Sequence, residues 1–229
     1  MMTKPRIGIT TSYNDNRQSV DVRYANAVEN AGGIPILVPM FQQASTAKEF
    51  ATLLDGLIIT GGPGITRGLV GELPDDLPPV DTVRDMGDEL IYHAMADRPI
   101  LGICYGMQFV NAMAGGTLYG DVQHQLKVNA HSSDRGATDH SVEISANTHL
   151  YDILKVETLI TNTHHRQAIA EVGEGFLATA YAPDGIIEAI ESKDRRIIGV
   201  QFHPEQMTDR AQAIFDDLIA RSKLSYPVG

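Results

Sequence analysis

The chain has 229 residues, and its composition excludes several classes of protein before any motif is considered. Its formal net charge at pH 7 is −11 without any basic run, so nucleic acids and anionic membranes are not expected as partners. The single cysteine excludes an intrachain disulfide and a metal site built from cysteines. No apolar run approaches the ~20 residues of a membrane helix, and no signal-peptide core is visible, so we expect a cytoplasmic protein.

Strands and helices alternate along the first half of the chain. We expect strands at 6–11, 34–38, 57–60 and 99–103, and helices at about 21–31, 46–54, 82–96 and 105–114. Thr46 and Glu49 form a capping-box pattern at the start of the second helix. The third helix follows an irregular stretch rich in proline and acid, 72–81, and its predicted core-facing residues are Val83, Met86, Leu90 and Ala94.

The second half has shorter elements, and its pattern indicates more antiparallel pairing. After a polar, irregular stretch at 121–139, strands are expected at about 140–144, 158–160, 176–181, 187–191 and 197–201. A final helix from about Thr208 to Ser222 would pack through Ala211, Ile214 and Leu218. The pattern predicts an α/β fold: a mainly parallel sheet with helices on both faces, and a site at the carboxyl ends of the strands.

The only cysteine, Cys104, lies between Gly102 and Gly106, where a predicted strand ends and a predicted helix begins. Gly-x-Cys-x-Gly permits a tight strand-to-helix turn that projects the central side chain above the sheet. The positive end of the following helix favours the thiolate, which is the nucleophilic form. The alternative is a buried structural cysteine, which is the commoner fate of a free thiol.

A histidine and a carboxylate, His203 and Glu205, lie two positions apart near the C-terminus. Because the residue before a proline avoids the helical region, Pro204 favours an extended His203, and the two side chains would then share a face. An imidazole placed so can act as base while the carboxylate orients it. The alternative for His-Pro-Glu alone is a solvated turn.

A glycine-rich loop at 61–64 follows the predicted strand at 57–60. The backbone amides of Gly62 and Tyr105 would form an oxyanion hole if they converged above the thiol. An ordinary turn is the alternative. A phosphate-binding loop is disfavoured, since neither Gly-Lys-Ser/Thr nor Gly-x-Gly-x-x-Gly is present.

These segments together resemble the class I glutamine amidotransferase-like superfamily, and most closely the γ-glutamyl-γ-aminobutyrate hydrolases, a peptidase C26-like family. The likeness covers nearly the whole chain through the segments 5–10, 31–35, 99–104, 115–119, 162–167, 184–191 and 199–205. It implies one domain over 1–229 with a flavodoxin-like three-layer sandwich. At family level it also implies a homodimer.

Carried over by position, the resemblance implies that Cys104 is the nucleophile, His203 the general acid/base and Glu205 its partner, with Gly62 and Tyr105 as the oxyanion hole. Its implied substrate-binding residues are Gln108, Thr163, His165, Arg166 and Gln167. The resemblance implies no cofactor. We expect no metal either: His124, His131, His140 and His149 lack ligand spacing and carboxylate company, and adjacent His164 and His165 would point to opposite faces.

Three departures from the family pattern concern the substrate. Tyr105 stands where many of these hydrolases carry Arg, Arg166 replaces the second histidine of the pocket motif, and the loop after Gly62 reads Pro-Gly-Ile-Thr-Arg. These changes leave the triad intact but leave the amine of the substrate open. Tyr105 is also common in glutamine-hydrolysing domains, which keeps glutamine as an alternative substrate.

The expected function is therefore a cysteine-dependent hydrolase of γ-glutamyl amides, such as γ-glutamyl-γ-aminobutyrate, which acts through a thioester and serves nitrogen metabolism. A glutaminase that delivers ammonia to a synthetase or transferase partner is the first alternative. A non-catalytic module that binds γ-glutamyl compounds is the second. An α/β-hydrolase fits less well, since its acid normally precedes the histidine at a distance.

Overall fold

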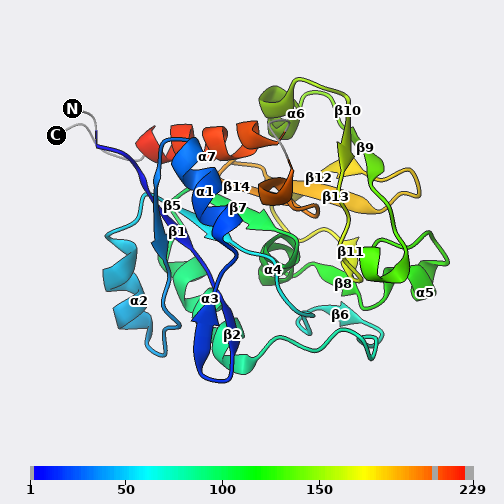
Figure 1. The fold of residues 1–229 in the computed structure, drawn as a ribbon, viewed down its shortest axis with the longest axis horizontal. Helices are drawn as coiled ribbons and strands as arrows, with labels where there is room; N and C mark the ends of the chain where they lie inside the picture. Colours follow the sequence, from blue (N-terminus) through cyan, green and yellow to red (C-terminus); the bar gives the residue numbers. More distant parts are fainter. Residues whose placement is uncertain (1–2, 208–210, 225–229) are drawn as a thin grey trace.

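The computed structural model describes residues 3–207 and 211–224, and its centre is a nine-stranded sheet (Figure 1). The strand order is β10-β9-β12-β13-β14-β7-β5-β1-β4. Five neighbours pair in parallel: β4 (Ile34–Leu37), β1 (Arg6–Ile9), β5 (Gly56–Ile59), β7 (Ile100–Ile103) and β14 (Ile197–Val200). The carboxyl ends of these strands therefore meet at one edge of the sheet.

The other part of the sheet is antiparallel. It comprises β13 (Ile187–Ser192), β12 (Phe176–Tyr181), β9 (His140–Ile144) and β10 (Thr158–Thr161). Strand β14 lies at the boundary, since it pairs with β7 in parallel and with β13 in antiparallel fashion. A chain segment from the end of the sequence is thus inserted beside the strand that leads to Cys104.

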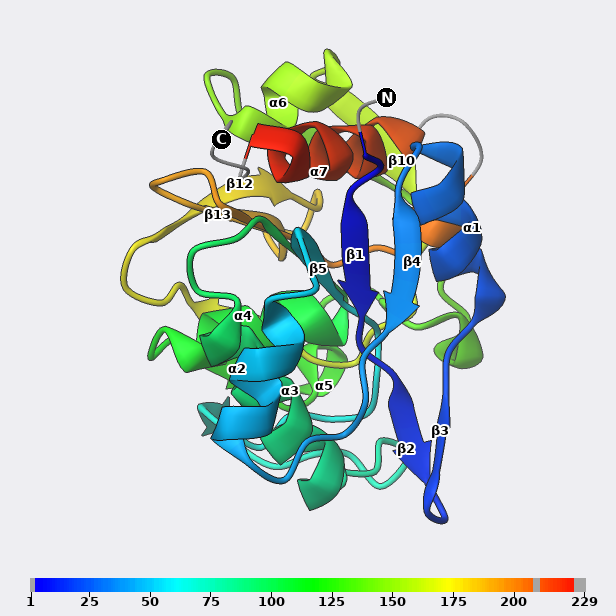
Figure 2. The same cartoon turned by 90° about the vertical axis from the view of Figure 1, so that its left-hand side faces the viewer.

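Helices cover both faces of the sheet and bury a separate apolar core on each. One core contains residues of α1 (Val22–Asn30) and α7 (Gln212–Leu224), and α6 (His149–Leu154) packs against α7. The other core contains residues of α2 (Ala44–Ala51), α3 (Thr82–Ala94) and α4 (Tyr105–Met113). Figure 2 shows α1 and α2 on opposite sides of β1 and β4. The α/β fold expected from the sequence is confirmed.

Several short elements lie outside the sequence-based expectations. A second sheet contains β6 (Leu69–Val70), β8 (Thr117–Tyr119) and β11 (Ala168–Glu171), and β2 (Ser12–Asn14) pairs with β3 (Arg17–Ser19) as a hairpin that extends from the sheet (Figure 2). The remaining pieces are α5 (Val122–Leu126) and the 3₁₀ turns η1 (Ser133–Arg135) and η2 (Pro204–Gln206). Strands of two to four residues are too short for a periodic apolar pattern to reveal them.

Two details of the predicted helices are wrong. Helix α2 begins at Ala44 after Gln43, so Thr46 and Glu49 lie inside the helix and form no capping box. Helix α3 buries Arg84, Gly87, Asp88 and Ile91, whereas Met86 is 40% exposed. Of the other predicted core-facing residues, Leu90 and Ala94 are partly buried and pack against the core. The apolar pattern missed the fully buried face because an ion pair between Arg84 and Asp88 occupies it.

The final helix packs as expected, through Ala211, Ile214 and Leu218, which are all buried in the core beside α1. The first three residues of the predicted helix, 208–210, lie outside the described residues. Within the described ranges, no helix has the length and apolarity needed to cross a membrane.

Candidate active site

Cys104 lies at the turn between β7 and α4 with φ 53° and ψ −104°. A positive φ is strained for a residue with a Cβ, and such strain of about 1–3 kcal/mol concentrates at functional sites. The flanking glycines make the turn possible: a Cβ on Gly106 would overlap the Ile59 carbonyl oxygen, and one on Gly102 would lie 2.6 Å from the Gly106 carbonyl oxygen. The elbow predicted from the Gly-x-Cys-x-Gly spacing is present, and it leaves Cys104 7% exposed.

His203 and Glu205 are in direct contact, although not along a strand as the sequence predicted. Strand β14 ends at Val200, and Pro204 begins the 3₁₀ turn η2, which brings the Glu205 Oε1 atom to 2.7 Å from His203 Nδ1. The tight turn, rather than an extended backbone, places the carboxylate against the ring. The contact fixes which ring nitrogen faces the acid and leaves Nε2 for proton exchange.

The backbone of His203 is clamped from both sides by Asn162. The His203 amide donates to Asn162 Oδ1 at 2.8 Å, and Asn162 Nδ2 donates to the His203 carbonyl at 3.0 Å. Asn162 opens the segment 162–167 that resembled the family motif, but sequence reasoning gave it no role. The Asn162 side chain thus both accepts from and donates to the backbone of His203, and these two bonds fix the position of the imidazole.

The imidazole of His203 is buried beside two acidic side chains, the thiol of Cys104 and the carboxyl group of Glu205. Burial alone would disfavour the imidazolium, but the side chains of Cys104 and Glu205 outweigh that effect and raise the pKa of His203 to about 10. At neutral pH the ring is therefore protonated when Cys104 is a thiolate. This is the charge pairing typical of an activated cysteine nucleophile.

The loop after β5 is held by Arg84, a residue that sequence reasoning missed. The buried guanidinium lies 4.3 Å from the centre of the Tyr105 ring and donates to the Gly61 carbonyl at 3.0 Å. A Cβ on Gly62 would lie 2.5 Å from Arg84 Nη1, so a larger residue there would have to displace the guanidinium. Arg84 thus joins both segments that carry the predicted oxyanion-hole amides.

The ion-pair partner of Arg84 is Asp88, whose Oδ2 lies 3.2 Å from Arg84 Nε. Burial raises the pKa of Asp88 to about 6, although Arg84 acts in the opposite direction. From the other side, the Tyr24 hydroxyl accepts a hydrogen bond from the Gly61 amide at 3.0 Å. The glycine loop is fixed from two directions as a result.

The amides of Gly62 and Tyr105 have no hydrogen-bond acceptor among residues 3–207 and 211–224. The Tyr105 amide is free because it lies in the first turn of α4. Gly62 lines a cavity of about 70 Å³ together with Cys104. Two unpaired donors near the thiol fit the expected oxyanion hole, whose assignment stays a prediction.

Most of the predicted substrate residues line the same cavity. Gln108, His165, Arg166 and Gln167 lie on its wall, together with Pro63, Leu77 and His164, whereas Thr163 does not. The Thr163 hydroxyl instead donates to the His131 carbonyl at 2.7 Å. His164 was given no role in the predicted site, but its ring centre lies 5.8 Å from that of His203.

Two of these residues hold the cavity wall together. The Gln167 side chain accepts from the Ile65 amide at 2.7 Å and donates to the Ile65 carbonyl at 2.9 Å. The Gln108 side-chain amide donates to the Gln167 carbonyl and to Gln201 Oε1, both at 3.0 Å. These bonds join α4 to the loop after β5, and they give both glutamines a positioning role.

Arg166 ties the cavity to two acidic loops. Its guanidinium contacts Asp76 Oδ2 at 2.9 Å and Asp134 Oδ2 at 3.2 Å, and Arg135 Nε also donates to Asp76 Oδ2 at 3.0 Å. Hydrogen bonds from Arg135 and Arg166 hold the pKa of Asp76 well below its usual range. The departure from histidine at position 166 therefore comes with its own acidic partners.

One expectation about the remaining histidines is wrong. All four that were expected to lack carboxylate company have it. His124 Nδ1 lies 2.8 Å from Asp121 Oδ2, and His149 Nε2 lies 3.0 Å from Asp217 Oδ1. His131 and His140 lie near the buried Glu188 on β13, and His165 approaches the same carboxylate. The adjacent His164 and His165 turn different ways, His164 toward the His203 ring and His165 toward Glu188. The separation of these residues in the sequence, from 131 to 188, concealed the cluster.

Comparisons with known proteins agree with this architecture. The sequence profile of the Peptidase C26 family matches residues 5–205. Protein NtpR of Enterococcus hirae is 37% identical over 205 residues, covering 84% of this chain and 85% of that protein. The γ-glutamyl-γ-aminobutyrate hydrolase PuuD of Escherichia coli K12 is 29% identical over 222 residues, covering 90% and 87%.

Among solved structures, the fold matches that of a "putative GMP synthase" component from Thermoplasma acidophilum. The TM-score is 0.68 at 19% sequence identity, and the match covers 96% of this chain and 94% of that chain. At this identity the likeness concerns the fold alone.

Proposed function

Because the chain belongs to the Peptidase C26 family, we propose that it is a cysteine-dependent hydrolase of γ-glutamyl amides. The observation that carries the proposal is the geometry at Cys104. A strained thiol at the start of a helix interacts with a buried histidine that contacts a carboxylate, and two unpaired amides lie on the neighbouring segments. A structural cysteine would require none of these.

In the proposed reaction the Cys104 thiolate attacks the side-chain carbonyl carbon of the substrate. The oxyanion of the tetrahedral intermediate accepts hydrogen bonds from the Gly62 and Tyr105 amides. His203 gives its proton to the amine nitrogen, the carbon–nitrogen bond breaks, and a γ-glutamyl thioester remains. Glu205 keeps the ring oriented and stabilises its charge.

Hydrolysis of the thioester reverses the role of His203. The neutral ring takes a proton from water, and the resulting hydroxide attacks the thioester carbonyl carbon. The carbon–sulfur bond breaks, glutamate leaves, and the Cys104 thiolate again faces an imidazolium. Atoms and charge balance without any cofactor.

One residue on the cavity wall supports a substrate whose acyl group carries a carboxylate. Arg166 is a guanidinium on the cavity wall. Its Nε and Nη2 atoms contact Asp76 and Asp134, so the α-carboxylate of a γ-glutamyl substrate would bind through Nη1. The relative PuuD is named for γ-glutamyl-γ-aminobutyrate hydrolysis, which makes this amide the first substrate to test. The amine would extend past Arg166 toward the 72–81 segment, which contributes Leu77 to the cavity.

A glutaminase that passes ammonia to a partner synthetase is the second candidate, because Tyr105 follows the nucleophile as in glutamine-hydrolysing domains. The chemistry at Cys104 would be identical, and the leaving group would be ammonia. The two candidates differ in whether the protein acts alone.

The test is glutamate release by the purified protein, measured with glutamine and with a panel of γ-glutamyl amines, and with Cys104→Ala as the blank. Rapid hydrolysis of one substituted amide would support the free-standing hydrolase. If no substrate of the panel released glutamate while Cys104 was still labelled by a glutamine-like electrophile, the result would favour the glutaminase. A thiol inert toward both would refute the catalytic proposal.

A further inference from the structure

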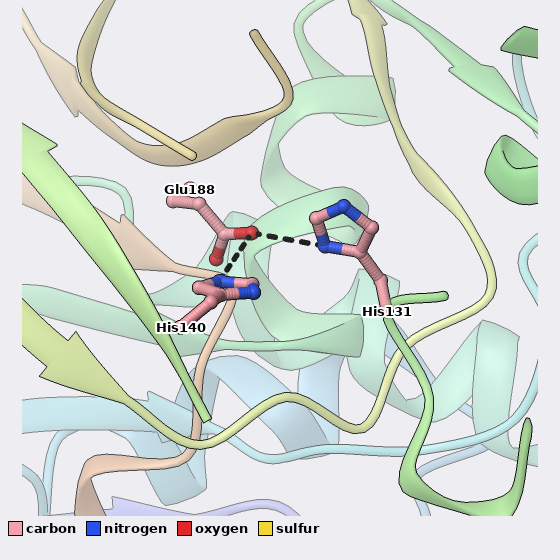
Figure 3. A group of neighbouring side chains, drawn as sticks. All are labelled: His131, His140 and Glu188. Carbon is pink, nitrogen blue, oxygen red and sulfur yellow. Dashed lines mark ion pairs between the residues drawn. The ribbon is translucent and has the colours of Figure 1, made fainter. Parts of the chain in front are cut away.

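A second buried cluster lies on the antiparallel part of the sheet, outside the cavity at Cys104. The carboxylate of Glu188 is fully buried, and three imidazole nitrogens approach its Oε1 atom. His140 Nε2 and His165 Nε2 each lie 3.4 Å away, and His131 Nδ1 lies 3.6 Å away. Figure 3 shows His131 and His140 directed toward Glu188 from two different segments.

In His131 and His165, the ring nitrogen that points away from Glu188 makes a hydrogen bond. That bond determines whether the nitrogen facing Glu188 carries a proton or a lone pair. His131 Nε2 lies 2.9 Å from Asp184 Oδ2, and His165 Nδ1 lies 2.9 Å from the Gln167 carbonyl oxygen. Both partners accept hydrogen bonds only, so each neutral ring must place its proton there. The other nitrogen of each ring then directs a lone pair at a carboxylate, and two acceptors facing each other require a cation or added protons between them.

The spacing matches ligands of one ion better than hydrogen bonds. Charge-assisted N–H···O bonds are about 2.7–2.9 Å long, whereas all three contacts with Glu188 are longer. His131 Nδ1, His140 Nε2, His165 Nε2 and both Glu188 oxygens have no hydrogen-bond partner among the described residues. Two ligands at about 2.0–2.1 Å from a tetrahedral Zn²⁺ lie about 3.4 Å apart, close to the separations seen here.

We propose that His131, His140 and Glu188 bind one divalent transition-metal cation of the Zn²⁺ type. One ligand atom from each residue lies within 4.8 Å of the others, so small side-chain shifts bring all three to one ion. Imidazole and carboxylate donors suit Zn²⁺ and its neighbours, whereas Mg²⁺ and Ca²⁺ prefer oxygen alone. Asp184 orients His131 as carboxylates commonly orient metal-bound histidines.

A neighbouring cavity gives access to the proposed metal site and room for a fourth ligand. His131, His140 and Asp184 line a cavity of about 330 Å³, through which an ion or a water molecule could reach the site. His165 lies on the other side, with its ring 4.9 Å from that of His131. It connects the cluster to the wall of the cavity at Cys104, which it also lines.

The competing explanation is a cluster of hydrogen-bonded imidazolium ions. Burial alone would raise the pKa of Glu188, but the neighbouring histidines hold it below its usual range. Added protons could thus neutralise the same carboxylate without a metal. The two explanations differ in stoichiometric metal binding, and that difference is independent of any activity at Cys104.

The experiment uses the full chain, stripped with a chelator and titrated with Zn²⁺ against a chromophoric competitor. One equivalent should bind, Co²⁺ in place of Zn²⁺ should give the visible bands of a low-coordinate nitrogen and oxygen site, and Zn²⁺ should raise the melting temperature. Glu188→Gln and His140→Ala should each weaken binding about 100-fold or more.

His149→Ala is the matched control, because His149 is also paired with an acid, Asp217 at 3.0 Å, but lies outside the cluster. It should bind Zn²⁺ like the wild type. Absence of stoichiometric binding by the folded wild type would overturn the proposal, and so would equal binding by His140→Ala. Should Glu188→Gln fail to fold, the partly exposed His140 still provides the decisive variant.

Discussion

Two buried groups of histidine and carboxylate lie near the neighbouring strands β13 and β14, and they differ in spacing. At the end of β14, His203 Nδ1 and Glu205 Oε1 are 2.7 Å apart and share a proton. On β13, Glu188 faces three imidazoles at 3.4–3.6 Å and shares a hydrogen bond with none of them. The short pair can orient a ring during proton transfer, whereas the longer spacing leaves room for an ion.

The comparison teaches that residue type alone does not define the chemistry of a buried histidine. What differs is the partner on the far side of each ring. His203 has the thiol of Cys104 there, while His131 has Asp184 and His165 has a backbone carbonyl. A ring between an acid and a thiol moves a proton, and a ring fixed by a second acceptor keeps its lone pair in place.

The largest expected effect is at Cys104. Cys104→Ala should lower the turnover of γ-glutamyl amides about 10⁴-fold or more, since removal of a nucleophile leaves only binding and the oxyanion hole. Glutamate release and the melting temperature should be measured together. Cys104→Gly should be equally inactive but more stable than Cys104→Ala by about 1 kcal/mol, because glycine relieves the positive φ. Retained activity in either variant would refute the mechanism.

The same substitution at the two carboxylates tests the comparison most directly. Glu205→Gln should lower kcat about 10²–10⁴-fold with little change in melting temperature, because it disturbs general acid–base catalysis. Glu188→Gln should mainly lower Zn²⁺ affinity and the melting temperature of the Zn²⁺-loaded protein. The contrast would collapse if Glu188→Gln reduced kcat as strongly as Glu205→Gln while leaving metal affinity intact.

Arg84→Met should combine a stability loss with a rate loss. Breaking the buried pair with Asp88 should cost about 3–5 kcal/mol, measured by urea unfolding, because an unpaired charge remains. Loss of the bond to the Gly61 carbonyl should also misplace the Gly62 amide and lower kcat about 10²-fold. In the double variant Arg84→Met with Asp88→Leu, stability should recover while kcat stays low. Recovery of both would mean that Arg84 acts on folding alone.

The smallest effect concerns the pH dependence of stability. The pKa of His203 is raised from 6.5 to about 10, so its contribution to the free energy of unfolding is fully present below pH 6.5 and is lost as pH rises through about 10. Urea unfolding at intervals between pH 6.5 and 10 should show this loss in the wild type and a shallower one in His203→Gln. Identical slopes would argue against a protonated His203 in the folded protein.

The sequence predicted the part of the site that depends on local backbone geometry. Gly102 and Gly106 flank Cys104 within five residues, and the close approach of their backbones explains why those positions carry glycine. The contact between His203 and Glu205 was also predicted, but the turn that makes it was mistaken for a strand. Pro204 excludes a helical His203, and it begins a 3₁₀ turn as readily as it continues an extended segment.

The Glu188 cluster and Arg84 could not be predicted in the same way. Residues 140 and 188 meet because β9, β12 and β13 pair in antiparallel fashion. Residues 131 and 165 meet beside an isolated bridge between Ser132 and His164, and no local spacing encodes either meeting. Arg84 was hidden for another reason: a charged residue on a helix is normally solvated, and only its ion pair with Asp88 and its contact with the Tyr105 ring allow its burial.

The solitary thiol at the head of α4 also bears on oxidative damage. Peroxide would convert Cys104 to a sulfenic acid, and these 229 residues contain no second cysteine to trap that species as an intrachain disulfide. Unless a thiol from another molecule reacts with the sulfenic acid first, further oxidation gives the sulfinic acid, which is not reversed. Protection of this protein in an oxidising environment would therefore depend on a thiol supplied by another molecule.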